Sequence, residues 1–232
     1  MSGNSGFNGF GADTVRFLED LEDNNNRAWF QENKHRYDSD VLEPALAFIG
    51  AMGPLLARVS ECFTAIPKRM GGSLMRVYRD TRFSRDKTPY KTNIGIQFRH
   101  EQGRDVHAPG YYLHIETTGC FLGAGMWHPE PAALKAIRER IAEHPDAWRK
   151  VLRSRRFKSE YTFAGNSLKR PPRGFAPDLP HLEDIKRKDF IGVSDFSIER
   201  AAGAGFPEEV AERFARATPL MAFLCTAVGV EF

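Results

Sequence analysis

Apolar and polar side chains alternate along the stretch Tyr111-Tyr112-Leu113-His114-Ile115-Glu116-Thr117. Because successive side chains of a β-strand point to opposite faces, this stretch predicts one apolar face and one polar face, the latter carrying Tyr112, His114 and Glu116. Residues 74–78, 93–99 and 120–127 alternate in the same way. The loops that join these four segments are too short for crossover helices, so the sequence predicts an antiparallel sheet of about four or more strands.

Segments of helical period precede this sheet, over about residues 13–62. We expect a short helix over Asp13–Asp23 with Asp13 as its N-cap, and a second helix from about Arg27. An apolar helix should follow over Ala45–Cys62, with an interruption at Gly53-Pro54 because these residues break helices.

Helices and loops should also follow the sheet, over about residues 130–232. The last helix should begin at Pro207, a favoured first-turn residue, and kink at Pro219. The sequence therefore predicts a single α+β domain over residues 1–232, with a sheet at about 73–127 and helices packed on its apolar face.

The composition is typical of a folded soluble protein. Of the 232 residues, 41% are hydrophobic, 12% aromatic and 27% charged, which argues against a disordered chain. The apolar stretch Leu220–Val230 is shorter than the roughly 18 residues that span a bilayer, and residues 1–12 do not resemble a secretory signal. The widely spaced Cys62, Cys120 and Cys225 predict neither a zinc site nor a disulfide framework. We therefore expect a cytoplasmic, bacterial-type protein with no membrane partner and with an oligomeric state that the sequence does not specify.

Positive charge is concentrated in two segments. The whole chain has 33 basic and 30 acidic residues, a net charge of +3, but residues 68–104 carry +7, residues 149–173 carry +8 and the rest carry −12. Such a partition is typical of a protein with a local anion site. The alternative is that the basic side chains neutralise the acidic helices through surface ion pairs worth about 0–1 kcal/mol each.

The first basic segment contains a motif of regularly placed polar residues. The motif residues are Arg76, Arg79, Asp80, Arg82, Asp86, Lys87, Tyr90, Lys91 and Asn93. Arginine recognises phosphate and carboxylate groups through paired N–H donors, which a merely solubilising surface does not need. We expect the two aspartates to hold neighbouring guanidinium groups, and Phe83 to pin this loop to the core. The motif predicts an anionic, phosphorylated ligand, with Tyr90 and Asn93 as neutral donors.

This pattern resembles the bacterial family known as domain of unknown function 2461. The hallmark of that family is matched at each motif position and at Phe83. The resemblance extends to the segments Asn24-Asn25-Asn26, Trp29-Phe30, Asn33-Lys34 with Tyr37, and Leu168-Lys169-Arg170-Pro171, and it covers the whole chain. It implies no particular activity, cofactor or catalytic residue.

The remaining candidate chemistry lies on the polar face of the sheet. His114 and Glu116 share this face, where an acid and a base could act on a phosphorylated small molecule. The alternative is a solvated sheet face with an incidental histidine. His100, His107, His114 and His128 lack the spacing of metal ligands, and no nucleotide-binding motif occurs, so we expect neither a metal nor a cofactor.

The second basic segment ends in Lys169-Arg170-Pro171-Pro172-Arg173. This stiff loop could bring Lys169 and Arg170 over the sheet to close a pocket with the first motif, or it could be a surface connector. Three hypotheses therefore stand: binding of a phosphorylated ligand, for which nucleic acid is a possible partner; an enzyme that uses His114 and Glu116; and a purely structural, ion-paired motif.

Overall fold

One antiparallel sheet organises the computed structural model, which describes residues 6–103 and 109–232. In this part of the chain the sheet has six strands in the order β1-β2-β3-β4-β6-β5. The strands are β1 (Phe63–Thr64), β2 (Ile94–His100), β3 (Gly110–Ile115), β4 (Cys120–Met126), β5 (Thr162–Ala164) and β6 (Phe190–Phe196). The predicted α+β fold with a sheet of four or more strands is therefore confirmed.

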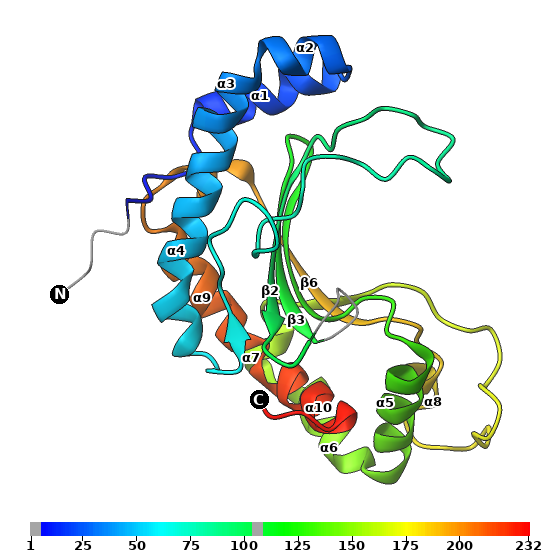
Figure 1. Cartoon of the computed structure of the whole chain (residues 1–232). Helices are drawn as coiled ribbons and strands as arrows, with labels where there is room; N and C mark the ends of the chain where they lie inside the picture. The colour runs from blue at the N-terminus through cyan, green and yellow to red at the C-terminus, as the bar shows by residue number, and fades with distance from the viewer. Residues whose placement is uncertain (1–5, 104–108) are drawn as a thin grey trace.

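Helices surround one face and both ends of this sheet (Figure 1). The N-terminal elements are α1 (Ala12–Asp23), α2 (Arg27–Glu32), α3 (Lys34–Arg36), the π-helical turn η1 (Tyr37–Leu42) and α4 (Glu43–Ala57). After β4 follow α5 (Pro131–Glu143), α6 (Pro145–Arg153), α7 (Arg155–Lys158), α8 (Leu182–Ile185), the 3-10 turn η2 (Ile198–Ala202), α9 (Phe206–Arg216) and α10 (Thr218–Val228).

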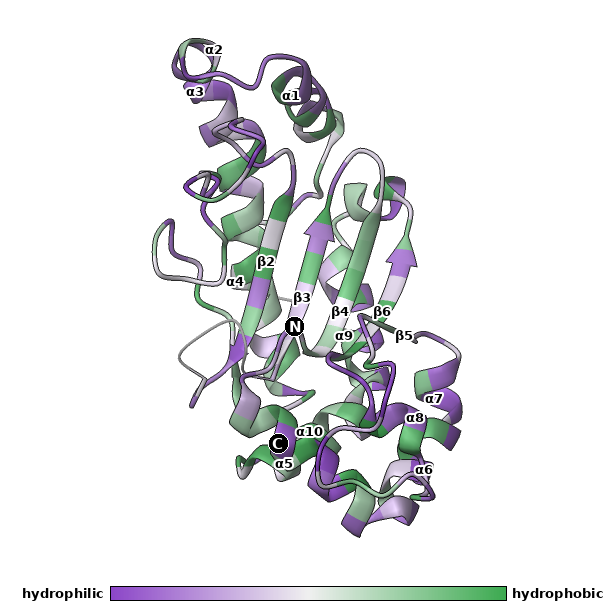
Figure 2. Cartoon of the chain, turned by 90° about the vertical axis from the view of Figure 1, so that its right-hand side faces the viewer, coloured by the Kyte–Doolittle hydropathy of each residue, from purple (hydrophilic) through white to green (hydrophobic). Residues whose placement is uncertain are grey.

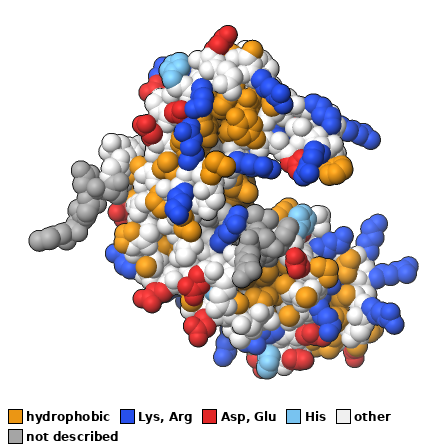
Figure 3. Space-filling model, in the orientation of Figure 1, with side chains coloured by type: hydrophobic (Ala, Val, Ile, Leu, Met, Phe, Trp, Pro, Cys, Tyr) orange, Lys and Arg blue, Asp and Glu red, His pale blue; other side chains and the backbone are white. Residues whose placement is uncertain are grey.

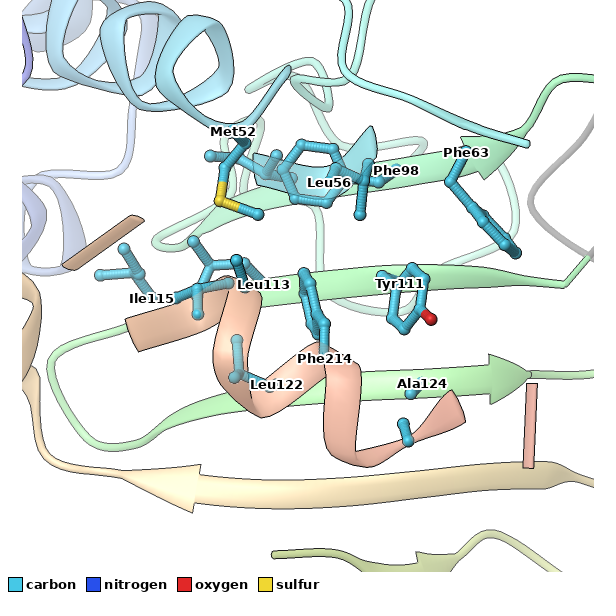
Figure 4. Packing of buried hydrophobic residues seen from close by; sticks show 14 of the residues in the cluster. Met52, Leu56, Phe63, Phe98, Tyr111, Leu113, Ile115, Leu122, Ala124 and Phe214 are labelled. Atoms are coloured by element: carbon cyan, nitrogen blue, oxygen red, sulfur yellow. The ribbon is translucent and has the colours of Figure 1, made fainter. Parts of the chain in front are cut away.

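The core lies between the apolar face of the sheet and the helices α4, α9 and α10, which pack against it (Figure 4). Antiparallel pairing sets Ile96 opposite Leu113 and Leu113 opposite Leu122, so the alternating apolar residues of three strands meet in one layer. Met52 of α4 and Phe214 of α9 are fully buried against this layer. This packing confirms the prediction that helices cover the apolar face of the sheet.

Several predicted boundaries are wrong. Residues 74–78 form no strand: Leu74 bridges Ile96 and Tyr78 bridges Tyr90 only as isolated pairs. The helix α4 runs through Gly53-Pro54 without a break, because burial of its apolar side chains offsets the hydrogen bond that proline cannot donate.

Two predicted helix ends also differ from the structure. Asp13 is not the N-cap of α1: Gly11 occupies that position and Asp13 pairs with Arg16 in the first turn. Instead of kinking at Pro219, the C-terminal helix divides into α9 and α10, and Pro219 lies in the first turn of α10, where its missing N–H costs no hydrogen bond.

The helical run Lys34–Ala57 is long and apolar enough to cross a membrane by length and composition alone. It is longer than Leu220–Val230, the apolar stretch that the sequence alone indicated as too short to span a bilayer. Seven residues of α4 are buried, among them Phe48, Ile49 and Met52. Their packing in the core accounts for the apolarity of this run.

The opposite face of β2, β3 and β4 faces the viewer in Figure 2, and in the described part of the chain no helix covers it. Figure 3 shows a hollow beside this face, between α1–α3 with the 76–93 loop above and α5 with α8 below. Lys and Arg side chains lie on both sides of the hollow. The sheet thus presents its polar face to solvent between two basic edges.

Candidate functional site in the 76–93 arm

Residues 76–93, called the arm below, project from the end of the sheet where β2 begins (Figure 1). The two sides of the arm are joined near its base by backbone hydrogen bonds from Arg79 N to Pro89 O (2.9 Å) and from Lys91 N to Val77 O (2.8 Å). The motif residues therefore occupy one hairpin-like projection, and its first and last residues lie close together.

Ion pairs within the arm cross-link its outer part. Arg79 Nη1 donates to Asp86 Oδ2 (2.5 Å) and to Thr88, and Arg82 donates twice to Asp80, at 3.0 and 2.6 Å. The prediction that the two aspartates hold neighbouring guanidinium groups is confirmed. Three of the predicted ligand-binding cations are thereby engaged within the arm, because Lys87 Nζ also donates to Thr81 O (2.8 Å).

These contacts lower the pKa of both aspartates. Hydrogen bonds from the Arg82 side chain and then from its backbone lower the pKa of Asp80 to about 2. The backbone N–H of Thr88 and the Arg79 side chain lower the pKa of Asp86 to about 2. Both carboxylates are therefore charged throughout the neutral range.

The arm is anchored at Tyr90 and not at Phe83. Phe83 is 95% exposed at the tip of the arm, so the expectation that it pins the loop to the core is wrong. Tyr90 is 2% exposed instead, and its ring stacks on Phe30 of α2 with centroids 4.0 Å apart. The motif does not show which of the two aromatic residues is buried. The burial of Tyr90 depends on its contact with Phe30, in a helix about 60 residues earlier in the chain.

Asn25 fixes the backbone at this anchor. Its Nδ2 donates to Tyr90 O and its Oδ1 accepts from Tyr90 N, both at 3.0 Å. The side-chain amide thus acts as a short strand would, satisfying both backbone groups of a buried residue. Sequence reasoning placed Asn25 in the family pattern but did not assign it to the site.

A cavity of about 360 Å³ lies at the base of the arm. The residues that line it are Glu22, Asn25, Arg79, Asp86, Thr88, Tyr90, Lys91, Thr92 and Asn93. The structure thus brings five of the predicted site residues together around one space. Arg76, Asp80, Arg82 and Lys87 belong to the same arm but do not line this cavity.

Two cations line this cavity, Arg79 and Lys91. Arg79 is paired with Asp86, whereas Lys91 has no carboxylate within ion-pair distance among the described residues. Its side chain is half-buried; burial lowers the pKa of the ammonium group, and the positive charge of Arg76 lowers it further. Asp86 is paired with Arg79, which leaves Glu22 as the other carboxylate of the lining. An anion placed beside Lys91 and Arg76 would relieve the repulsion between the two cations.

The polar face of the sheet meets the cavity at Asn93. Asn93 Nδ2 lies 3.4 Å from His114 Nδ1, the Tyr112 hydroxyl lies 3.0 Å from the same nitrogen, and His114 Nε2 lies 3.3 Å from Glu116. An amide nitrogen only donates, so Nδ1 accepts and the proton of neutral His114 is on Nε2, facing Glu116. The predicted grouping of His114 with Glu116 on one face is confirmed.

Neighbouring residues hold this His114 cluster in place. The imidazole stacks on Phe121 with centroids 4.6 Å apart. A Cβ at Gly95 would come within 2.8 Å of the Tyr112 hydroxyl, so glycine leaves the room that this phenol occupies. Burial, with a smaller contribution from Glu116, raises the pKa of Tyr112 to about 12. The phenol is therefore protonated at neutral pH and donates to His114.

The second basic segment leaves the sheet at the opposite end. The strand register places the arm where β6 ends, whereas the loop that carries Lys169 and Arg170 follows β5, beside the start of β6. Both residues are exposed, and across residues 6–103 and 109–232 no hydrogen bond or ion pair joins them to the arm. The arm and this loop therefore lie at the two ends of the open sheet face and do not close one pocket.

No group of three metal-ligating side chains occurs among the residues that the structure describes. His107 lies outside these residues. The three cysteines form no disulfide.

The fold and the site define an α+β protein with a cross-linked basic arm and a cavity at its base. A family model described as "Conserved hypothetical protein (DUF2461)" matches residues 13–223, and the chain belongs to this family. No curated protein and no solved structure matches the chain.

Proposed function

We propose that this protein binds a phosphorylated ligand in the cavity at the base of the arm, with Lys91 as the cation that meets the phosphate group and Arg76 adding positive charge nearby. The observation that carries the proposal is the half-buried ammonium of Lys91, which lines the cavity without a carboxylate partner in the described part of the chain. Burying a cation without a counter-ion is costly, and a ligand anion removes that cost.

The other cations of the motif support this binding by shaping the arm. Arg79 is held by Asp86 and Thr88, and Arg82 by Asp80, so their charges are already matched. This observation favours a structural role for part of the motif, as in the hypothesis of an ion-paired structural motif. Asn93 and Tyr90 line the cavity and add neutral polar atoms next to Lys91.

A thermal-shift screen tests the proposal, because a ligand that binds only the native state raises its melting temperature. Inorganic pyrophosphate, sugar phosphates and nucleoside triphosphates are added to the wild type and to two variants. Lys91→Met removes the unpaired positive charge from the cavity lining, and Lys158→Met is the matched control because Lys158 is exposed in the other basic segment. We expect a shift in the wild type and in Lys158→Met but none in Lys91→Met; equal shifts in all three proteins would contradict the proposal.

A second candidate function, acid/base catalysis on a phosphorylated small molecule, is favoured by the His114 cluster. The imidazole has a phenol at one nitrogen and a carboxylate at the other, at 3.0 and 3.3 Å, and Asn93 joins it to the cavity. A carboxylate that orients a histidine is a common arrangement for proton transfer. Under this candidate His114 moves the proton and Glu116 sets its tautomer.

Release of inorganic phosphate from a panel of sugar phosphates and nucleotides tests this second function. His114→Ala should abolish turnover and leave the pyrophosphate-induced thermal shift intact. His114→Gln, which retains a polar side chain of similar length, covers the case in which the alanine variant unfolds. If the wild type turns over nothing in the panel, or if either folded variant retains full activity, the second candidate function is wrong.

A further inference from the structure

We propose that the tip of the arm is a stacking platform for a base of single-stranded nucleic acid, with Phe83 as the ring on which the base lies. This inference rests on the proposed binding of phosphate at the base of the arm and names the polymer to which that phosphate belongs. It adds a site that lies outside the cavity, because neither Phe83 nor its neighbours line it.

A single exposed apolar residue is common on protein surfaces and carries no inference by itself. The surroundings of Phe83 are less common. Its ring is 95% exposed, the Arg82 guanidinium lies over it at 5.8 Å, and Arg85 is exposed two residues further on. The ring offers a face on which a base can stack, and Arg85, which has no ion pair in the described part of the chain, offers a charge for a phosphate; Arg82 is already paired with Asp80.

The tip is held in position before any ligand arrives. The pairs Arg79–Asp86 and Arg82–Asp80 and the bond from Lys87 to Thr81 O cross-link the segment on both sides of Phe83. The base of the arm is fixed in turn by Tyr90 against Phe30. A ring that is already positioned loses little conformational entropy when a base stacks on it, which favours binding.

Tyr78 provides a second aromatic face on the same arm. It is 52% exposed and packs beside Tyr90, with ring centroids 5.3 Å apart. Tyr78 and Phe83 are five positions apart in the sequence, which is up to about 16 Å of extended chain. A ligand that reaches from the cavity past Tyr78 to the tip is thus a polymer of several nucleotides.

The distribution of charge also favours a polymer over a small phosphorylated molecule. The basic arm and the loop with Lys169 and Arg170 lie at opposite ends of the open sheet face, where a small ligand reaches only one of them. A single strand has a regular line of phosphates and can contact both. A flat lipid surface fits less well, because Lys and Arg side chains lie on either side of a hollow (Figure 3).

Fluorescence anisotropy with a labelled oligothymidylate of about twelve nucleotides, a length within the usual range of single-strand binding sites, tests this proposal. The proteins are the wild type, Phe83→Ala, Phe83→Trp and the control Met70→Ala, since Met70 is 85% exposed and lies outside the arm. We expect Phe83→Ala to weaken oligonucleotide binding about five- to one-hundred-fold. Phe83→Trp and Met70→Ala should bind like the wild type, and pyrophosphate binding should be the same in all four proteins.

Each contrary outcome has a defined meaning. Stacking at the tip is refuted if Phe83→Ala binds the oligonucleotide as tightly as the wild type. It is also refuted if Phe83→Trp binds as weakly as Phe83→Ala. If pyrophosphate binds but the oligonucleotide does not, this inference fails and the proposed function stands; if neither binds, both fail. The wild type could instead sediment with phosphatidylserine vesicles. If Phe83→Ala abolishes that sedimentation and leaves oligonucleotide binding unchanged, the tip binds a membrane surface and the proposal is overturned.

Discussion

Replacing Asn25 with alanine should destabilise the protein well beyond the usual effect of a surface substitution. The substitution removes both hydrogen bonds to Tyr90, each 3.0 Å long, and leaves a buried N–H and a buried C=O without their partner. Each unsatisfied group costs about 1–3 kcal/mol, and water can reach part of this half-buried site, so we expect a total loss of about 2–3 kcal/mol. For a chain of this length that corresponds to a fall in melting temperature of about 4–12 °C.

Urea unfolding at equilibrium measures this loss directly. Asn24→Ala is the matched control, because the adjacent Asn24 side chain is exposed and donates only to Asp20 O at 2.9 Å. We expect the control to lose about 1 kcal/mol or less. If Asn25→Ala lowers the free energy of unfolding no more than Asn24→Ala does, the hydrogen bonds of Asn25 do not anchor the arm at Tyr90.

Three further predictions concern the arm and the polar face. Gly95→Ala would place a Cβ 2.8 Å from the Tyr112 hydroxyl and 3.0 Å from Met75 Sδ; because both atoms belong to side chains that can shift, we expect Tyr112 to move away from His114 at a cost of only about 1 kcal/mol in urea unfolding, and an unchanged midpoint would contradict the close packing at Gly95. Because the pKa of Asp80 and of Asp86 is lowered from 3.8 to about 2, their charged forms favour the folded arm above pH 3.8, and that contribution is lost as the pH falls through about 2. Carboxyl carbon chemical shifts should show both midpoints near 2, and midpoints near 3.8 would mean that the arm is not cross-linked in solution. Arg79→Ala should lower the melting temperature only slightly, because exposed ion pairs contribute little to stability, and should raise the pKa of Asp86 by removing one of its hydrogen bonds; no change in that midpoint would show that Thr88 alone sets it.

The central sheet could be predicted because its pattern is local. The alternation along residues 111–117 specifies which side chains face the core, and the same period recurs in β2 and β4. Short edge strands such as β1 and β5 span two and three residues, too few to show a period. The continuity of α4 through Pro54 depends on packing against the sheet, which local helix-breaking rules do not include.

The arm shows the same division between local and distant information. The pairing of Arg79 with Asp86 and of Arg82 with Asp80 joins residues that are seven and two positions apart, and the motif predicted that the two aspartates hold guanidinium groups, though not which ones. The anchoring of Tyr90 by Asn25 joins residues 65 positions apart, so no spacing rule reveals it. The sequence predicts that Phe83 pins the loop to the core, whereas only the three-dimensional arrangement shows that it extends into solvent.

Calorimetric titration of inorganic pyrophosphate into the wild type, Lys91→Met and Lys158→Met tests the central claim most directly. Charge-assisted hydrogen bonds contribute about 1.5–3 kcal/mol, so Lys91→Met should bind pyrophosphate about 10- to 150-fold more weakly than the wild type. Lys158→Met carries the same net charge as Lys91→Met and should retain wild-type affinity. Equal weakening in the two variants would mean that overall charge and not the cavity attracts the anion, and unchanged affinity in Lys91→Met would contradict the account.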